Sequence, residues 1–99
     1  MKTRIDLSAQ VAEFMGALAP EPRKRLRKAV RALERGEGDP KPLQGKLLSY
    51  ARLRSAQYRV IYREGLEQGV RVIKCLFAEK RDFVYEMFER MRLDDLTKD

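Results

Sequence analysis

Arginine and tyrosine side chains gather in two short segments whose residues alternate, and this combination could bind a phosphodiester. If Tyr50–Arg54 is a strand, alternation places Arg52 and Arg54 on one of its faces together with Tyr50. In the strand expected over Tyr58–Glu64, Arg59 occupies one face with Ile61 and Arg63. Arginine binds phosphate through a planar fork of donors, so this pattern favours a phosphate-binding surface.

The alternating partners of these arginines decide which way they point. If Leu53 and Val60 face the helices, then Arg52, Arg54 and Arg59 converge on the open face of the sheet. Like charges on neighbouring strands repel, so such a cluster needs an anionic partner or dilution by solvent. The alternative interpretation is an ordinary charged outer face.

The charge of the whole chain points in the same direction. There are 22 basic and 15 acidic residues, which gives a net charge of +7, and arginine outnumbers lysine. Basic residues dominate 23–35 and 52–81, whereas the tail from Asp82 to Asp99 is acidic. This outline favours an anionic partner, which can be RNA, DNA or an acidic protein.

Composition also excludes several classes of protein. The chain has no histidine and a single cysteine, so zinc sites, Ser-His-Asp and Cys-His catalysis, and ribonucleases of the His-His type are not expected. No metal or cofactor is expected. The 99 residues predict one domain, 1–99. No apolar run is long enough to span a membrane and no signal peptide is visible, so we expect a cytoplasmic protein.

The first part of the chain predicts a strand and a helical hairpin. Residues Thr3–Leu7 alternate like a strand, and Ser8 can cap the helix that follows. Pro20-Glu21-Pro22 separates this helix from a second one, which Gly36 ends. The apolar faces at helical spacing are Val11, Phe14, Met15 and Leu18 in the first helix and Leu26, Ala29, Val30 and Leu33 in the second.

After a loop over Glu37–Lys46, the period changes from helix to strand. Strands are expected over Tyr50–Arg54, Tyr58–Glu64 and Val70–Ala78, joined in an antiparallel meander, with Cys75 in the core beside Ile73 and Phe77. Asp82 can cap a last helix. The order βααβββα indicates an α+β fold in which an N-terminal helical hairpin packs on an antiparallel sheet, followed by a C-terminal helix, with the helices covering one sheet face.

Several of these segments resemble one known family. The stretch Tyr58-Arg59-Val60-Ile61-Tyr62 is similar to the "YRVIY" strand of the RelE/ParE toxin superfamily. It is preceded by Leu43-x-Gly45 and Leu53-Arg54-Ser55, which resemble the family's "L-x-G" and "L-R-S" motifs. A hydrophobic strand then ends in the basic turn Lys80-Arg81, followed by Val84-Tyr85. The resemblance covers nearly the whole chain and implies the RelE/ParE-like order of elements.

The resemblance implies a toxin of a type II toxin–antitoxin pair. RelE-like members are mRNA interferases, endoribonucleases that cut messenger RNA in the ribosomal A site and inhibit translation with a basic cluster and a tyrosine. ParE-like members poison DNA gyrase instead. Arg81 and Tyr85 are four residues apart here, slightly closer than in the best-known RelE-like nucleases. The catalytic set implied by position is Arg52, Arg54, Arg59, Arg81 and Tyr85.

Further roles follow from this identification. The residues expected to bind RNA are Arg23, Arg27, Arg31, Arg63 and Lys80. The residues expected to bind the antitoxin are Phe83, Met87 and Phe88. The expected partners are therefore a cognate antitoxin with acidic and apolar residues, the ribosome and messenger RNA. The alternatives are a gyrase-directed toxin, an inactive member that only binds, and a plain nucleic-acid-binding protein.

Overall fold

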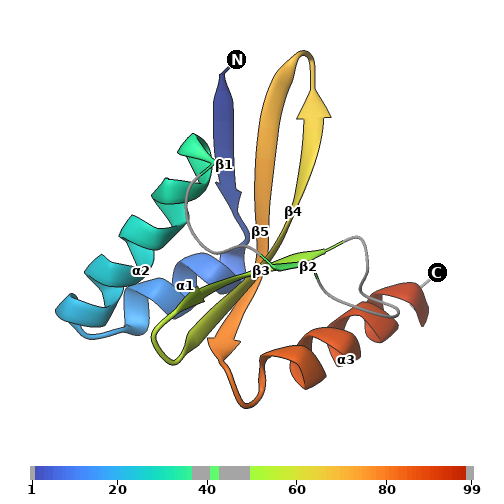
Figure 1. Cartoon of the computed structure of the whole chain (residues 1–99). Helices are drawn as coiled ribbons and strands as arrows, with labels where there is room; N and C mark the ends of the chain where they lie inside the picture. The colour runs from blue at the N-terminus through green and yellow to red at the C-terminus, as the bar shows by residue number, and fades with distance from the viewer. Residues whose placement is uncertain (1, 37–40, 43–49, 98–99) are drawn as a thin grey trace.

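A mixed β-sheet carries helices on both of its faces (Figure 1). The computed structural model describes residues 2–36, 41–42 and 50–97. Within this part of the chain, the five strands lie in the order β1-β5-β4-β3-β2. The elements are β1 (Thr3–Leu7), α1 (Ala9–Ala17), α2 (Pro20–Ala32), the 3-10 helix η1 (Leu33–Arg35), β2 (Lys41–Pro42), β3 (Ala51–Ser55), β4 (Tyr58–Glu67), β5 (Val70–Lys80) and α3 (Val84–Thr97).

The expected α+β fold is confirmed, with two differences in the sheet. The meander β3-β4-β5 is antiparallel as predicted, but β1 pairs with β5 in parallel, with Ile5 opposite Ile73. Alternation of apolar residues indicates a strand and carries no information about its direction. The short strand β2, which pairs antiparallel with β3, lies inside the segment expected to be a loop.

Local sequence signals define the helical hairpin. The Ser8 hydroxyl accepts a hydrogen bond from the Val11 N–H at 3.2 Å and so caps α1 as predicted. Pro20 is the first residue of α2, where its missing N–H costs nothing. Gly36 ends η1 with a φ of 69°, a left-handed conformation that glycine adopts without a steric penalty. Among the described residues, no helix is long and apolar enough to cross a membrane.

The larger hydrophobic cluster lies between the helical hairpin and one face of the sheet. Leu53 of β3 and Val60 of β4 both point into it, as alternation predicts. We call this side the hairpin face. The buried members of the cluster are Val11, Met15, Leu26, Val30, Leu33, Leu53, Val60, Tyr62, Ile73, Cys75 and Ala78.

A β-bulge in β5 supplies a second, smaller cluster on the opposite face. Tyr62 is paired with Cys75 and the adjacent Ile61 with Phe77, so Leu76 is an extra residue that reverses the alternation of the strand. Phe77 therefore points away from Cys75, whereas the sequence predicted that both would share one core. On this second side, which we call the α3 face, the buried cluster consists of Ile61, Phe77, Val84 and Phe88.

The second cluster corrects the expectation that the helices cover one face only. α1 and α2 pack on the hairpin face, while α3 packs on the other face through Val84 and Phe88. The bulge at Leu76 places Phe77 on this second face, beside Ile61 of β4.

The bulge also lies where the pairing between β1 and β5 ends. From there on, the side chains of Ser8 and Gln10 bind backbone groups at the edge of β5. The Ser8 hydroxyl donates to the Leu76 carbonyl oxygen at 2.9 Å. The Gln10 amide donates to the carbonyl oxygen of Ala78 at 2.7 Å and accepts from the N–H of the same residue at 2.8 Å. The Gln10 side chain therefore continues the hydrogen-bond ladder of β1 along β5 and fixes the last residues of that strand.

Candidate functional site

Three arginines lie on the α3 face, at the end of the sheet where β3 and β4 meet. Arg54 of β3 is directly opposite Arg59 of β4, and Arg52 is opposite Ile61. Since Ile61 belongs to the cluster under α3, the arginines that alternate with Leu53 and Val60 share that face. The structure thus brings together Arg52, Arg54 and Arg59 as the sequence predicted.

Arg81 and Tyr85 join them from the turn between β5 and α3. The Arg81 N–H donates to the Gln57 carbonyl oxygen at 2.8 Å, which fixes this turn against the β3–β4 turn. Burial lowers the pKa of Arg59, and the positive charges of Arg52, Arg54 and Arg81 lower it further, whereas Tyr85 opposes them. The other four implied catalytic residues therefore all lie within electrostatic reach of Arg59. We call Arg52, Arg54, Arg59 and Arg81 the arginine cluster.

The two half-buried arginines of the cluster differ in how they are held. The Arg59 guanidinium donates from Nη1 to the carbonyl oxygens of Ala56 at 2.9 Å and Tyr58 at 2.8 Å. These bonds fix Arg59 on the turn in which Ala56 has a φ of 53°. Nη1 of Arg52 is buried and has no hydrogen-bond partner in the described part of the chain. Such a donor costs free energy unless something binds it, so Arg52 is poised for an incoming acceptor.

The exposed members of the site face solvent. Arg81 has only Asp82 as an ion-pair partner in the described residues, at 3.6 Å between Nε and Oδ1. Tyr85 is exposed on the first turn of α3. An anion at this site would meet four guanidinium groups, each with roughly five N–H donors in a fixed fork. Such a surface can bind a phosphate and stabilise negative charge that develops on it.

Arg63 and Lys80 stand apart from the cluster. Arg63 lies over the Tyr50 ring with its Cζ 5.8 Å from the ring centre, and Tyr50 packs edge-on against Phe88 at 5.1 Å. Arg63 is thus on the α3 face, two residues past Ile61 along β4 and four residues from Arg59. Lys80 is opposite Tyr58 and alternates with Glu79, so its side chain leaves from the other side of the strand.

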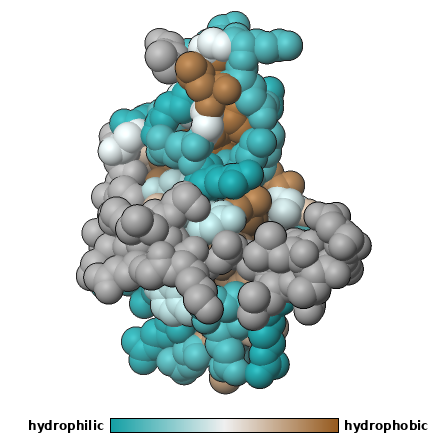
Figure 2. All heavy atoms as spheres, turned by 90° about the vertical axis from the view of Figure 1, so that its right-hand side faces the viewer, coloured by the Kyte–Doolittle hydropathy of each residue, from teal (hydrophilic) through white to brown (hydrophobic). Residues whose placement is uncertain are grey.

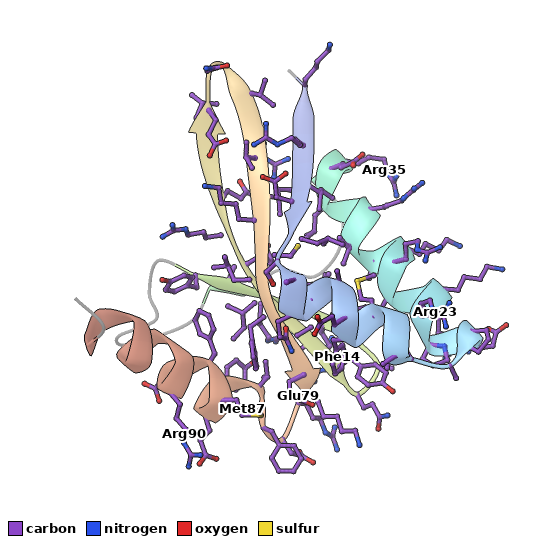
Figure 3. All side chains as sticks on the ribbon, turned by 180° about the vertical axis from the view of Figure 1, so that it is seen from behind. Phe14, Arg23, Arg35, Glu79, Met87 and Arg90 are labelled. Carbon is purple, nitrogen blue, oxygen red and sulfur yellow. The ribbon has the colours of Figure 1, made fainter. Side chains whose placement is uncertain are left out.

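The remaining residues expected to bind RNA lie on α2, on the opposite side of the sheet. Figure 3 shows Arg23 on α2 and Arg35 at the end of η1, well away from Met87 and Arg90 on α3. Arg23 is held by its own chain, because its Nη2 donates to the Leu18 carbonyl oxygen at 2.9 Å. A cavity of about 450 Å³ lies here against β1. Its lining includes Ile5, Leu7, Met15, Val30, Arg23, Arg27 and Arg31.

The three residues expected to bind an antitoxin separate into two groups. Phe83 and Met87 are 52% and 42% exposed at the start of α3 and form an apolar patch beside Arg81. Phe88 is only 1% exposed and belongs to the smaller core cluster, which corrects the expectation that it faces a partner. The reason is helical spacing: Val84 and Phe88 are four residues apart on the stripe that faces the sheet.

One residue near the cluster was missed by the sequence analysis. Glu79 is the partner of Arg59 in the β4–β5 ladder and shares its face, because the bulge at Leu76 reverses the alternation before it. Its Oε1 accepts the Lys80 N–H at 3.0 Å. The register between Tyr58–Ile61 and Phe77–Lys80 would have placed it there, but only with knowledge of the bulge.

The surface around α3 is mostly polar. Seen from the side toward which α3 runs, hydrophilic residues make up most of the coloured surface (Figure 2).

Solved structures with the same fold are toxins of toxin–antitoxin systems. A YoeB/ParE toxin from Agrobacterium tumefaciens superposes with a TM-score of 0.64 at 20% identity, over 82% of this chain and 99% of that one. The archaeal RelE–RelB complex from Pyrococcus horikoshii OT3 gives 0.61 at 27% identity, over 82% and 97%. The RelBE2 complex from Mycobacterium tuberculosis gives 0.60 at 17%, over 82% and 100%.

These neighbours confirm the RelE/ParE fold and support the resemblance to that toxin superfamily that the sequence indicates. No family model matches the chain, and no curated protein matches it in sequence.

Proposed function

We propose that this protein is the toxin of a toxin–antitoxin pair and that it inhibits translation by cutting messenger RNA on the ribosome without a metal ion. The observation that carries the proposal is the arginine cluster with Tyr85 beside it, on a fold shared with RelE and YoeB/ParE toxins. Histidine is absent from the chain, so we propose that the chemistry rests on the arginine cluster and Tyr85.

The reaction requires three tasks at the scissile phosphate. The 2′-oxygen of the RNA loses its proton and attacks phosphorus, negative charge grows on the non-bridging oxygens, and the 5′-oxygen leaves with a proton. Arg59 and Arg81 hold the phosphate and stabilise the growing charge, and Arg52 and Arg54 add further donors. Tyr85 stacks on a base or gives the proton to the leaving oxygen.

The distant basic residues favour a large RNA partner. The domain measures 35 × 35 × 23 Å, and the arginines of α2 lie on the opposite side of the sheet from the cluster. A short RNA bound at the cluster does not reach them. A ribosome surrounds the whole domain and can contact Arg63 and Lys80 as well as Arg23, Arg27 and Arg31 through its RNA.

An antitoxin that neutralises this protein must cover the arginine cluster. A segment with acidic and apolar residues would pair with the arginines and bury Phe83 and Met87, which are exposed next to them. We expect binding with a dissociation constant of about 1 nM or below, and an association rate that falls as salt is added. An association rate independent of salt would contradict the electrostatic part of this interaction.

The double variant Arg59→Ala/Arg81→Ala tests the proposal. Removing one positioned donor to a transition-state oxyanion costs about 10²–10³ in rate, so the double variant loses cleavage of messenger RNA on programmed ribosomes and no longer arrests growth. Arg90→Ala is the control, since Arg90 is an exposed arginine that pairs with Glu86 on α3. Circular dichroism checks that both variants fold.

Two outcomes would overturn the proposal. A folded double variant that cuts at the parental rate shows that the cluster serves binding or solubility only. Growth arrest in which DNA synthesis stops first, measured by pulse labelling, moves the target from messenger RNA to gyrase.

Conservative changes separate the individual roles. Arg81→Lys recovers only part of the activity, because one ammonium group does not reproduce the bidentate fork. Tyr85→Phe retains activity if the ring stacks on a base and loses it if the hydroxyl transfers a proton.

A further inference from the structure

The arginine cluster contains no group that can accept a proton. Guanidinium groups carry only donors and stay protonated in proteins, and a tyrosine hydroxyl is protonated at neutral pH. Cleavage by the 2′-hydroxyl nevertheless needs a base beside the scissile phosphate. In a chain without histidine, a carboxylate is the side chain that is ordinarily unprotonated at neutral pH and can accept this proton.

Glu79 is the carboxylate that the sheet register brings to the cluster. It is directly opposite Arg59, and Arg59 is directly opposite Arg54 on the next strand. Ala78 points into the hairpin core and Phe77 into the cluster under α3, so Glu79 leaves from the same face as Arg59. Figure 3 shows Glu79 at the end of β5, where the chain turns toward α3.

The neighbouring carboxylates are already engaged and more exposed. Asp82 pairs with Arg81 at 3.6 Å and Glu86 pairs with Arg90 at 2.9 Å, and their side chains are 73% and 67% exposed. Glu79 is half-buried, and its Oε1 accepts the Lys80 N–H. Its Oε2 has no hydrogen-bond partner within the described part of the chain. One oxygen is thus fixed to the backbone and the other is open.

We propose that Glu79 is the general base of the cleavage reaction, an inference that rests on the proposed function. The Glu79 carboxylate takes the proton of the 2′-hydroxyl as the bond between the 2′-oxygen and phosphorus forms. The bond between phosphorus and the 5′-oxygen breaks, and that oxygen takes a proton from the Tyr85 hydroxyl or from water. The products are a 2′,3′-cyclic phosphate and a 5′-hydroxyl. The proton on Glu79 passes to solvent, and Tyr85, or the hydroxide left by water, regains a proton from solvent.

The Glu79→Gln variant tests this role, because it keeps the shape and removes the base. General acid–base catalysis contributes about 10²–10⁴ in rate, so single-turnover cleavage on programmed ribosomes falls by about that factor. Binding of ribosomes that carry a messenger RNA with a 2′-O-methyl group at the cleavage position stays the same or becomes tighter, since a negative charge near phosphate is removed. Glu86→Gln is the matched control and cuts at the parental rate.

Chemical rescue separates a base from a structural residue. Acetate or formate restores cleavage by Glu79→Ala in proportion to its concentration, and it does not restore cleavage by Arg59→Ala. Cleavage by Glu79→Gln at the parental rate overturns the inference. Loss of rate in Glu79→Gln with an equal loss of binding, or the absence of rescue in a folded Glu79→Ala, overturns it as well. These results require a wild-type protein that cuts, so failure of the proposed function itself is seen separately, as absence of cleavage by the wild type.

Discussion

The two faces of the sheet are built from the same strands but differ in composition: one is mainly apolar core, and the other combines a small core with the arginine cluster. Among the described residues, the hairpin face has a cluster of eleven buried residues that includes residues of α1 and α2, while the buried cluster on the α3 face has four. The larger cluster carries most of the apolar burial that stabilises the fold. The smaller one anchors α3 and leaves the rest of its face to arginines that repel one another.

This difference shows that one strand can serve both purposes at adjacent positions. In β3, Leu53 is buried in the larger cluster on the hairpin face, while Arg52 and Arg54 on either side of it belong to the arginine cluster on the α3 face. The site on the α3 face includes features that lower the stability of the fold. They are like charges on paired strands, a buried Arg52 donor without a partner in the described residues, and a positive φ at Ala56 in the adjoining turn.

The largest expected effect is on the free energy of unfolding, in a comparison of two neighbouring alanine substitutions in β3. Leu53→Ala lowers the free energy of unfolding by about 2–5 kcal/mol, because it removes a fully buried side chain from the larger cluster. Arg54→Ala changes it by about 0.5 kcal/mol or less, because the side chain is exposed. Urea denaturation followed by circular dichroism measures both. Equal losses would mean that the two faces stabilise the fold alike.

The next effect concerns the donor without a partner. Arg52→Met replaces the guanidinium by an apolar side chain of similar length, and it raises the free energy of unfolding by about 1 kcal/mol while lowering cleavage activity. The control is Arg54→Met, which gains no such stability. A destabilised Arg52→Met would show that Arg52 helps to hold the fold and is not kept for a ligand.

Alkaline pH tests how well the hairpin face excludes water. Burial raises the pKa of the Cys75 thiol from 9.0 to about 12, and it also raises the pKa of Tyr62 above 10.0. Between pH 9 and 12 the unfolded thiol ionises while the folded one stays protonated, so stability is full below pH 9 and is lost as pH rises. The expected loss is about 1.4 kcal/mol per pH unit.

Denaturation in urea at pH 8, 9.5 and 10.5 measures this slope. Cys75→Ala removes the contribution of the thiol, so its stability depends less steeply on pH than that of the wild type. The same slope in both proteins would mean that water reaches Cys75.

The smallest expected effect on stability comes from glycine substitutions in the two turns that have a residue with positive φ. Ala56 has a φ of 53° and Gln68 a φ of 50°, a region that costs side chains with a Cβ about 1–2 kcal/mol. Replacing either by glycine stabilises the fold by about 0.5 kcal/mol, because the loss of strain is partly offset by chain entropy. Only Ala56→Gly lowers cleavage, because the more flexible glycine turn holds the carbonyl that accepts from Arg59 less firmly. Equal activity of both variants in the ribosome assay would show that this turn does not position the site.

Much of the fold was readable from periodicity. The helical hairpin, the meander and the face shared by Arg52, Arg54 and Arg59 follow from spacings that depend only on local geometry. The parallel direction of β1 did not follow, since it is set by packing between segments far apart in the chain.

What could not be predicted traces largely to one residue. The extra Leu76 in β5 reverses the side-chain alternation, and the run Cys75–Ala78 contains no charged position that reveals it. Phe77, Glu79 and the place of α3 all depend on that reversal. The prediction that Phe88 is exposed is wrong for a related reason. Phe88 packs against Phe77 in the smaller cluster, and Phe77 is on that face because of the bulge.

The contact between Gln10 and Ala78 has a consequence for solubility. A strand edge with open N–H and C=O groups is a template on which another chain can add, and β5 continues past the end of β1 with such an edge. The Gln10 amide occupies both groups of Ala78 with a side chain that cannot propagate a strand. A single glutamine thereby discourages edge-to-edge aggregation at the end of the sheet that carries Arg59 and Glu79.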